Sequence, residues 1–101
     1  SVAYHQHMID AHVCDDRYVD MARLMGNWLA SKPEDFLVEL ERLIDECNMG
    51  DLKMSDWGIV PEEFDAMASN ALDTNDALFA HDPVQLSHDD VVNILQASWV
   101  E

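Results

Sequence analysis

The chain has 101 residues, of which 49% are hydrophobic and 26% charged, and 21 acidic residues against five Lys and Arg give a formal net charge of −16. This charge opposes contact with a phosphate backbone and excludes autonomous nucleic-acid binding. The apolar content argues against a disordered acidic chain, and the length is that of one compact domain. No apolar run approaches the roughly 20 residues of a membrane span, and no basic amphipathic face is present to bind anionic lipid.

The first 13 residues do not resemble a signal peptide, because they carry three histidines, one aspartate and no Lys or Arg. Cys14 and Cys47 lie far apart without a partner motif. A disulfide between them is one option, and two buried thiols of a cytosolic protein are the favoured one. We therefore expect a cytoplasmic protein. The chain opens at Ser1 without an initiator methionine, which leaves open a processed product, a tag remnant or a piece of something longer.

Apolar residues recur with helical spacing along most of the chain. A leading helix is expected on the stripe Val2, Ile9 and Val13. A second helix is expected to end at a C-terminal glycine, Gly26. Its stripe follows the i, i+3, i+4, i+7 pattern at Tyr18, Met21, Ala22 and Met25.

The remaining helices are each opened by recognisable start signals. Ser31 as a cap, Pro33 and the acids after it open a helix whose stripe is Phe36, Leu40, Leu43, Ile44 and Cys47. Pro61 and two glutamates open the next, with the stripe Phe64, Met67, Ala68, Ala71 and Leu72. Ser87 and Asp90 fit a capping box before the stripe Val91, Ile94, Leu95 and Trp99.

The connections contain turn residues and little periodicity. Residues 47–60 predict a turn-rich link with one short helical turn, and residues 73–86 predict an ordered surface loop anchored by Leu78, Phe79 and Leu86. Trp28, Trp57 and Trp99 are expected to be core or interface anchors. No segment alternates with period two, so the sequence predicts a single all-α domain over residues 1–101, with about five helices around one core.

Three histidines crowd the first helix, which raises the question of a metal site. His5 and His7 lie about 200° apart on a regular helix and cannot chelate one ion. His5 and His12 share a face but stand roughly 10 Å apart along the axis, too far for ligands near 2.1 Å. His12 and Asp16 would be well placed only if the helix continued through Asp15. A solvated or partner-facing histidine cluster is therefore the favoured interpretation.

The sequence also argues against a calcium-binding loop, a catalytic nucleophile and a phosphate-binding loop. A calcium loop starting at Asp73 would need an oxygen ligand at its fifth position and a glycine at its sixth, where Ala77 and Leu78 stand. Ser87 is expected to cap a helix, and Cys47 to be a buried, inert thiol. Three glycines in the whole chain exclude a glycine-rich phosphate loop. We therefore assign no catalytic, cofactor-binding or metal-ligating residue.

Three segments resemble one enzyme family. The helix Arg17–Gly26 resembles its Arg-Tyr-x-x-Ile-Ala-x-x-Leu-Gly helix. Leu52–Ile59 followed by Pro61–Leu72 is similar to its Leu-x-x-x-Gly-Ile turn and the acidic-start helix after it. Asp82–Ser98 is similar to its last helix, which follows a proline-bearing loop and a cap. In this order and spacing, roughly residues 9–99 resemble the closing segment of iron-containing (group III) alcohol dehydrogenases.

The resemblance implies the dehydroquinate synthase-like helical domain of a longer enzyme. Its expected partners are an N-terminal dinucleotide-binding domain and further copies of itself, and its expected cofactors are NAD(P) and iron or zinc held by an Asp and three His. By the match at Arg17 and Tyr18, the last of those histidines would fall a few residues before Ser1. His5 or His7 would be this metal-binding histidine only if the segment between it and Arg17 is shortened. Residues 2–13 also lack the His-Gly and Leu-Pro motifs that the family has in this segment.

The sequence therefore predicts the C-terminal portion of a metal- and NAD(P)-dependent alcohol dehydrogenase, inactive by itself and without a bound cofactor of its own. The alternative is a stand-alone acidic helical module that binds a basic protein, and the charge of −16 is the reason to consider it. The reading frame upstream of Ser1 would separate them: a Gly-rich dinucleotide-binding half favours the enzyme, and an immediate start codon favours the module.

Overall fold

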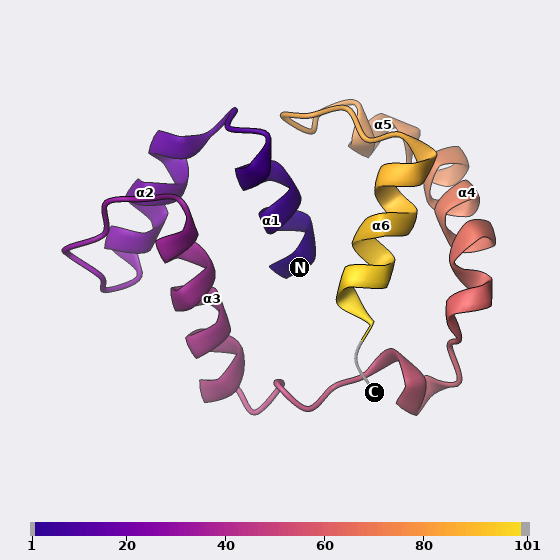
Figure 1. The fold of residues 1–101 in the computed structure, drawn as a ribbon, viewed down its shortest axis with the longest axis horizontal. Helices are drawn as coiled ribbons and strands as arrows, with labels where there is room; N and C mark the ends of the chain where they lie inside the picture. Colours follow the sequence, from indigo (N-terminus) through magenta and orange to yellow (C-terminus); the bar gives the residue numbers. More distant parts are fainter. Residues whose placement is uncertain (1, 100–101) are drawn as a thin grey trace. The chain divides into compact units, whose positions relative to one another are not determined.

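The computed structural model describes residues 2–99, and over that range it is all-helical, with no strand (Figure 1). This confirms the predicted all-α class. The chain divides into two compact units, residues 1–52 and residues 53–101. In the described range no helix is long and apolar enough to cross a membrane. The helices of the first unit are α1 (Val2–Asp10), α2 (Asp15–Leu24) and α3 (Glu34–Glu46).

Helix α3 contacts both α1 and α2, and the three helices enclose the core of the first unit. The buried apolar side chains come from all three helices and from the α2–α3 connection: Met8, Ile9, Tyr18, Ala22, Ala30, Phe36 and Leu37. One of them, Ala30, belongs to the connection, so this loop is part of the packed structure.

Helix α1 is shorter than predicted. It ends at Asp10, and His12 has a φ of 56° in the left-handed region, which breaks the helix before α2 begins at Asp15. Val13 consequently lies outside any helix and is exposed. Its assignment to the apolar stripe of the first helix is therefore wrong.

The α2–α3 connection begins as predicted at Gly26, whose φ of +116° suits glycine after a helix end. The guanidinium Nε of Arg23 donates to the carbonyl of Ala30 at 3.1 Å, and the amide of Leu29 donates to Asn27 Oδ1 at 3.2 Å. These bonds order the loop, in which the side chain of Trp28 is 80% exposed. Trp28 is therefore no core anchor of the first unit, and its other expected role, as an interface anchor, stays a prediction.

Helix α3 has a different cap from the one predicted. The carboxylate of Asp35 accepts hydrogen bonds from the amides of Ser31 and Lys32 at 2.9 and 3.2 Å. The first-turn aspartate therefore accepts from two backbone amides that precede the helix, and Ser31 donates its amide to Asp35 instead of capping the helix with its hydroxyl. These bonds also lower the pKa of Asp35, because they stabilise its ionised form.

The buried face of α3 agrees with the predicted stripe only in part, with Leu40 and Ile44 half-buried. Phe36 is buried as expected, but Leu43 and Cys47 are exposed, while Leu37 and Glu39 are buried instead. Both cysteines are free, Cys14 half-buried and Cys47 exposed. The prediction of two buried thiols is therefore wrong for Cys47.

The second unit begins with two short 3-10 turns, η1 (Met54–Trp57) and η2 (Pro61–Glu63). The first confirms the short helical turn expected in this link and ends at Gly58, with a φ of +78°. Trp57 lies in η1 and is exposed, so it is no core anchor in this unit.

Helices α4 (Phe64–Thr74) and α6 (His88–Ser98) pack on each other and form the core of the second unit (Figure 1). Phe64 and Ala68 of α4 are buried, as is Val91 of α6. The ring of Trp99 meets that of Phe64 edge-to-face with centroids 6.0 Å apart, so this tryptophan contacts the core as predicted.

The connection from α4 to α6 contains a short helix where a loop was predicted. This helix, α5 (Asp76–Phe79), begins directly after Asn75. Phe79 and Leu86 are half-buried, in keeping with their predicted anchoring role, whereas Leu78 is 69% exposed and anchors nothing.

Candidate functional site

A half-buried histidine lies at the centre of an aromatic cluster in the first unit. His5 of α1 meets the rings of Tyr4, Tyr18 and Phe36 edge-on, with centroid distances of 5.1–5.7 Å. Its Nδ1 lies 2.9 Å from the hydroxyl of Tyr18. The cluster joins all three helices of the unit, and His5 is part of the packed structure instead of being solvated or partner-facing as predicted.

Burial shifts both partners of this hydrogen bond toward their neutral forms. Desolvation lowers the pKa of His5 below its ordinary value of 6.5, and desolvation raises the pKa of Tyr18 above 10.0. At neutral pH the pair is therefore an uncharged imidazole and an uncharged phenol. Such a pair can position helices and exchange a hydrogen-bond proton, but it carries no charge with which to bind an ionic substrate.

The other two histidines of this segment do not join His5. His12 leaves the helix and places its Nδ1 3.0 Å from Asp15 Oδ2 at the start of α2, while His7 stays on α1. The partner of His12 is thus Asp15, and Asp16 is not involved. His12 therefore differs from the expectation that it shares a helix face with His5, because α1 ends at Asp10 before reaching it.

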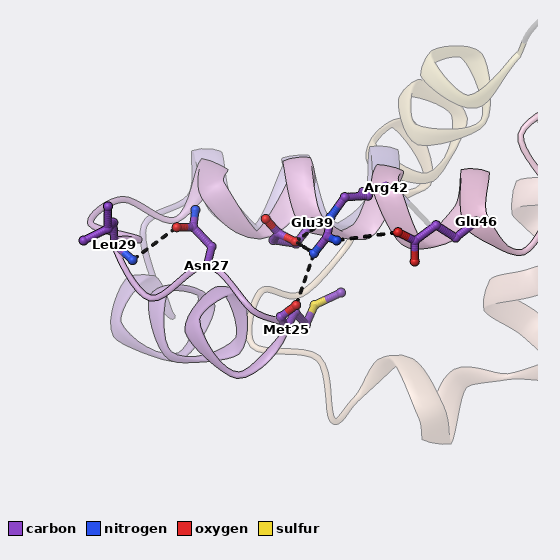
Figure 2. A network of polar contacts seen from close by, with 6 residues as sticks. All are labelled: Met25, Asn27, Leu29, Glu39, Arg42 and Glu46. Atoms are coloured by element: carbon purple, nitrogen blue, oxygen red, sulfur yellow. Dashed lines mark hydrogen bonds and ion pairs between the residues drawn. The ribbon is translucent and has the colours of Figure 1, made fainter.

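A charged network links α3 to the end of α2 (Figure 2). Arg42 Nε donates to Glu39 Oε2 at 3.0 Å, Nη2 donates to the same carboxylate and, at 3.3 Å, to the carbonyl of Met25, and Nη1 lies 3.5 Å from Glu46. The side chain of Glu39 is only 11% exposed, so Arg42 supplies the countercharge that a buried carboxylate needs. Sequence analysis missed this network, although a Glu and an Arg at i, i+3 on one helix are a recognisable pair.

A second charged cluster lies in the second unit, where α6 meets α4. His88 Nε2 is 3.1 Å from the backbone carbonyl of Asp65 and 3.3 Å from its Oδ1, and His88 Nδ1 is 3.7 Å from Asp89 Oδ1. The hydrogen bond to the carbonyl and the two carboxylates raise the pKa of His88 above 6.5. The sequence shows a histidine among acids at a helix start, but its contact with a residue 23 positions away could not be read from it.

The first turn of α6 confirms the predicted role of Ser87. Its hydroxyl accepts from the amide of Asp90 at 3.1 Å, and the Asp90 carboxylate accepts from the amide of Ser87 at 3.0 Å. This reciprocal capping box gives the serine a structural partner.

Between residues 2 and 99, no three His, Cys, Asp or Glu side chains converge to hold a metal ion. The titratable residues instead form pairs and small clusters that join helices within each unit. These contacts stabilise a helical scaffold. The Tyr18 hydroxyl lies 2.9 Å from His5 Nδ1, but this side chain is buried and desolvation raises its pKa, which makes it a poor nucleophile.

Comparison with known proteins identifies the scaffold. The model of the Fe-containing alcohol dehydrogenase family, C-terminal, matches residues 2–99. A search of the curated proteins finds no match, and a search of the solved structures finds none. The family match covers nearly the whole sequence, and its range includes the three segments that carry the resemblance. The chain belongs to the iron-containing alcohol dehydrogenase family, as a C-terminal domain of it.

Proposed function

We propose that this chain is the C-terminal helical part of a cytoplasmic alcohol dehydrogenase that uses a metal ion and NAD(P) to transfer a hydride between nicotinamide and an alcohol or aldehyde carbon. The observation that carries the proposal is the family match over residues 2–99. Two free cysteines are compatible with a reducing compartment. The helices would supply one wall of the cleft in which the reaction takes place.

Iron is the metal that the family implies, and the described residues do not fit a complete iron site. A site needs at least three converging ligands, whereas His5 is bonded to Tyr18 and His12 to Asp15. We therefore derive no step of the reaction from residues 2–99. In this proposal the phosphate-binding turn belongs to an N-terminal dinucleotide-binding domain and the metal lies in the cleft between that domain and the helical domain. The last metal-binding histidine precedes Ser1 by a few residues, and the whole enzyme is a homo-oligomer.

The experiment compares the 101-residue chain with the longer polypeptide that carries it at its C-terminus. Both are given Fe²⁺ or Zn²⁺, NADH or NADPH and a panel of aldehydes, and oxidation of the nucleotide is followed at 340 nm. We expect activity from the longer polypeptide, its loss on chelation and its recovery with metal, and no activity from the 101-residue chain. Activity of the short chain, or a metal-loaded long polypeptide that oxidises neither nucleotide, would contradict the proposal.

A second candidate is a stand-alone acidic module that binds a basic protein, and the net charge of −16 is the observation that favours it. This module would bind a lysine-rich protein tightly at low salt and lose most of that affinity at 0.5 M salt. Titration calorimetry against such a protein distinguishes a saturable one-to-one complex from diffuse charge attraction. The family match gives the dehydrogenase the stronger support.

A further inference from the structure

The side chain of His88 links the first turn of α6 to α4. The Ser87–Asp90 capping box occupies the backbone amides of Ser87 and Asp90, and His88 lies between those two residues with its ring directed to Asp65. His88 contacts Asp65 through its Nε2 and approaches Asp89 through its Nδ1. The two ring nitrogens therefore face different groups, on different helices.

The carbonyl of Asp65 decides which nitrogen carries the permanent proton. A carbonyl oxygen can only accept, so Nε2 at 3.1 Å must be the protonated nitrogen in the neutral ring. Titration then takes place at Nδ1, which lies 3.7 Å from the Asp89 carboxylate. In the neutral ring an Nδ1 lone pair faces that carboxylate, and in the charged ring an N–H group faces it.

The groups that face His88 are two carboxylates, Asp65 from α4 and Asp89 from α6 itself. The third acid of this turn, Asp90, has its carboxylate bonded to the amide of Ser87. Protonation of His88 therefore places one positive charge between two negative ones and strengthens the contact with α4. Because the side chains of Asp65 and Asp89 are exposed, added salt weakens this attraction.

We propose that His88 is a pH-sensitive latch between α6 and α4: its Nε2–H group holds the start of α6 to Asp65, and protonation at Nδ1 tightens that hold through Asp65 and Asp89. The inference does not depend on the proposed enzymatic function, since it concerns contacts within the second unit. Since the cluster raises the pKa of His88 above its ordinary value, the added stability is fully present below pH 6.5 and is lost as pH rises through the pKa of the folded state.

The test is a nitrogen-detected NMR titration of the histidine rings in the 101-residue chain. We expect the neutral ring of His88 to carry its proton on Nε2 and its midpoint to lie above 6.5. The midpoint should move toward 6.5 in Asp89→Asn and in Asp65→Asn, and in wild type at 0.5 M salt. A neutral ring protonated on Nδ1, or a midpoint that neither substitution changes, would overturn the proposal.

A substitution separates the hydrogen bond from the charge. His88→Gln keeps a donor near the position of Nε2 but cannot titrate, so protection of the first-turn amides of α6 against hydrogen exchange should become independent of pH between 6 and 8, after correction for the intrinsic rates. In wild type that protection should fall several-fold over the same range. The matched control is His81→Gln at an exposed position of the α5–α6 connection, which should behave as wild type. Equal pH dependence in His88→Gln and wild type would refute the latch.

Discussion

The core of the second unit depends on one aromatic side chain, and its removal is the sharpest test of the fold. Phe64 is 1% exposed and meets the ring of Trp99 edge-on. Phe64→Ala removes a fully buried ring, which costs about 3–5 kcal/mol, with roughly 0.5–1.5 kcal/mol of that from the aromatic pair. A unit of this size has about 2–7 kcal/mol of stability. We therefore expect Phe64→Ala to remove half or more of this stability and to increase the unfolding of α4 and α6 at 25 °C strongly.

The assay is hydrogen exchange resolved along the chain, together with urea unfolding followed by circular dichroism at 222 nm. Amides of α4 and α6 should lose their protection in Phe64→Ala. The matched control is Leu78→Ala, which truncates a side chain that is mostly exposed in α5 and should change the unfolding free energy by no more than about 0.5 kcal/mol. If Phe64→Ala lowers the free energy of unfolding by less than about 1 kcal/mol, Phe64 is not the central core residue of the second unit.

Two further predictions concern the polar contacts. Ser87→Ala removes one half of the capping box and should destabilise the second unit by about 1 kcal/mol, as measured by urea unfolding. Ser87→Asp should recover most of this loss. Equal stability of the two variants would refute the capping role. Burial lowers the pKa of His5, so its contribution to stability is present above pH 6.5 and is lost as pH falls through the folded pKa, the opposite direction to His88. The NMR midpoint of His5 should lie below 6.5, and Tyr18→Phe, which removes the hydroxyl partner, should change it; a midpoint above 6.5 would contradict the burial of the ring.

The order and type of the long helices could be predicted because their ends carry local signals. Gly26 ends α2 through a positive φ, Pro33 and Pro61 precede helices, and Ser87 caps α6. Each signal acts through the backbone of its own turn, so it requires no knowledge of the rest of the fold. The same reasoning explains why α5 was missed, since four residues are too short to show a periodic pattern.

The buried face of α3 was harder to predict than the helix ends, because it depends on which other helices pack against α3. A stripe of period 3.6 identifies one face, whereas α3 contacts both α1 and α2. The doubled contact covers Leu37 and Glu39 and leaves Leu43 outside. A buried glutamate is unexpected from hydropathy, and it is tolerated here because Arg42 pairs with it.

The candidate site residues are linked across the sequence by contacts that no local pattern contains. Arg42 reaches a carbonyl 17 positions away, and His88 one 23 positions away. The spacing argument applies to His5 and His7, which share α1, but not to His12, which lies beyond the end of that helix at Asp10. Spacing arguments cannot find a partner on another helix, which only the fold brings near.

The structure shows what two of the few cationic side chains do in a chain whose net charge is −16. Arg23 and Arg42, two of the five cations, donate to backbone carbonyls of the α2–α3 connection, at Ala30 and Met25. Both side chains also pair with carboxylates of their own helices, Arg23 with Asp20 and Arg42 with Glu39 and Glu46. Because a guanidinium can contact a carbonyl and a carboxylate together, as Arg42 does with Met25 and Glu39, replacement by lysine would keep the net charge and lose the double contact. These two arginines thus contribute to the fold of the first unit, while 21 acidic residues leave the chain strongly negative.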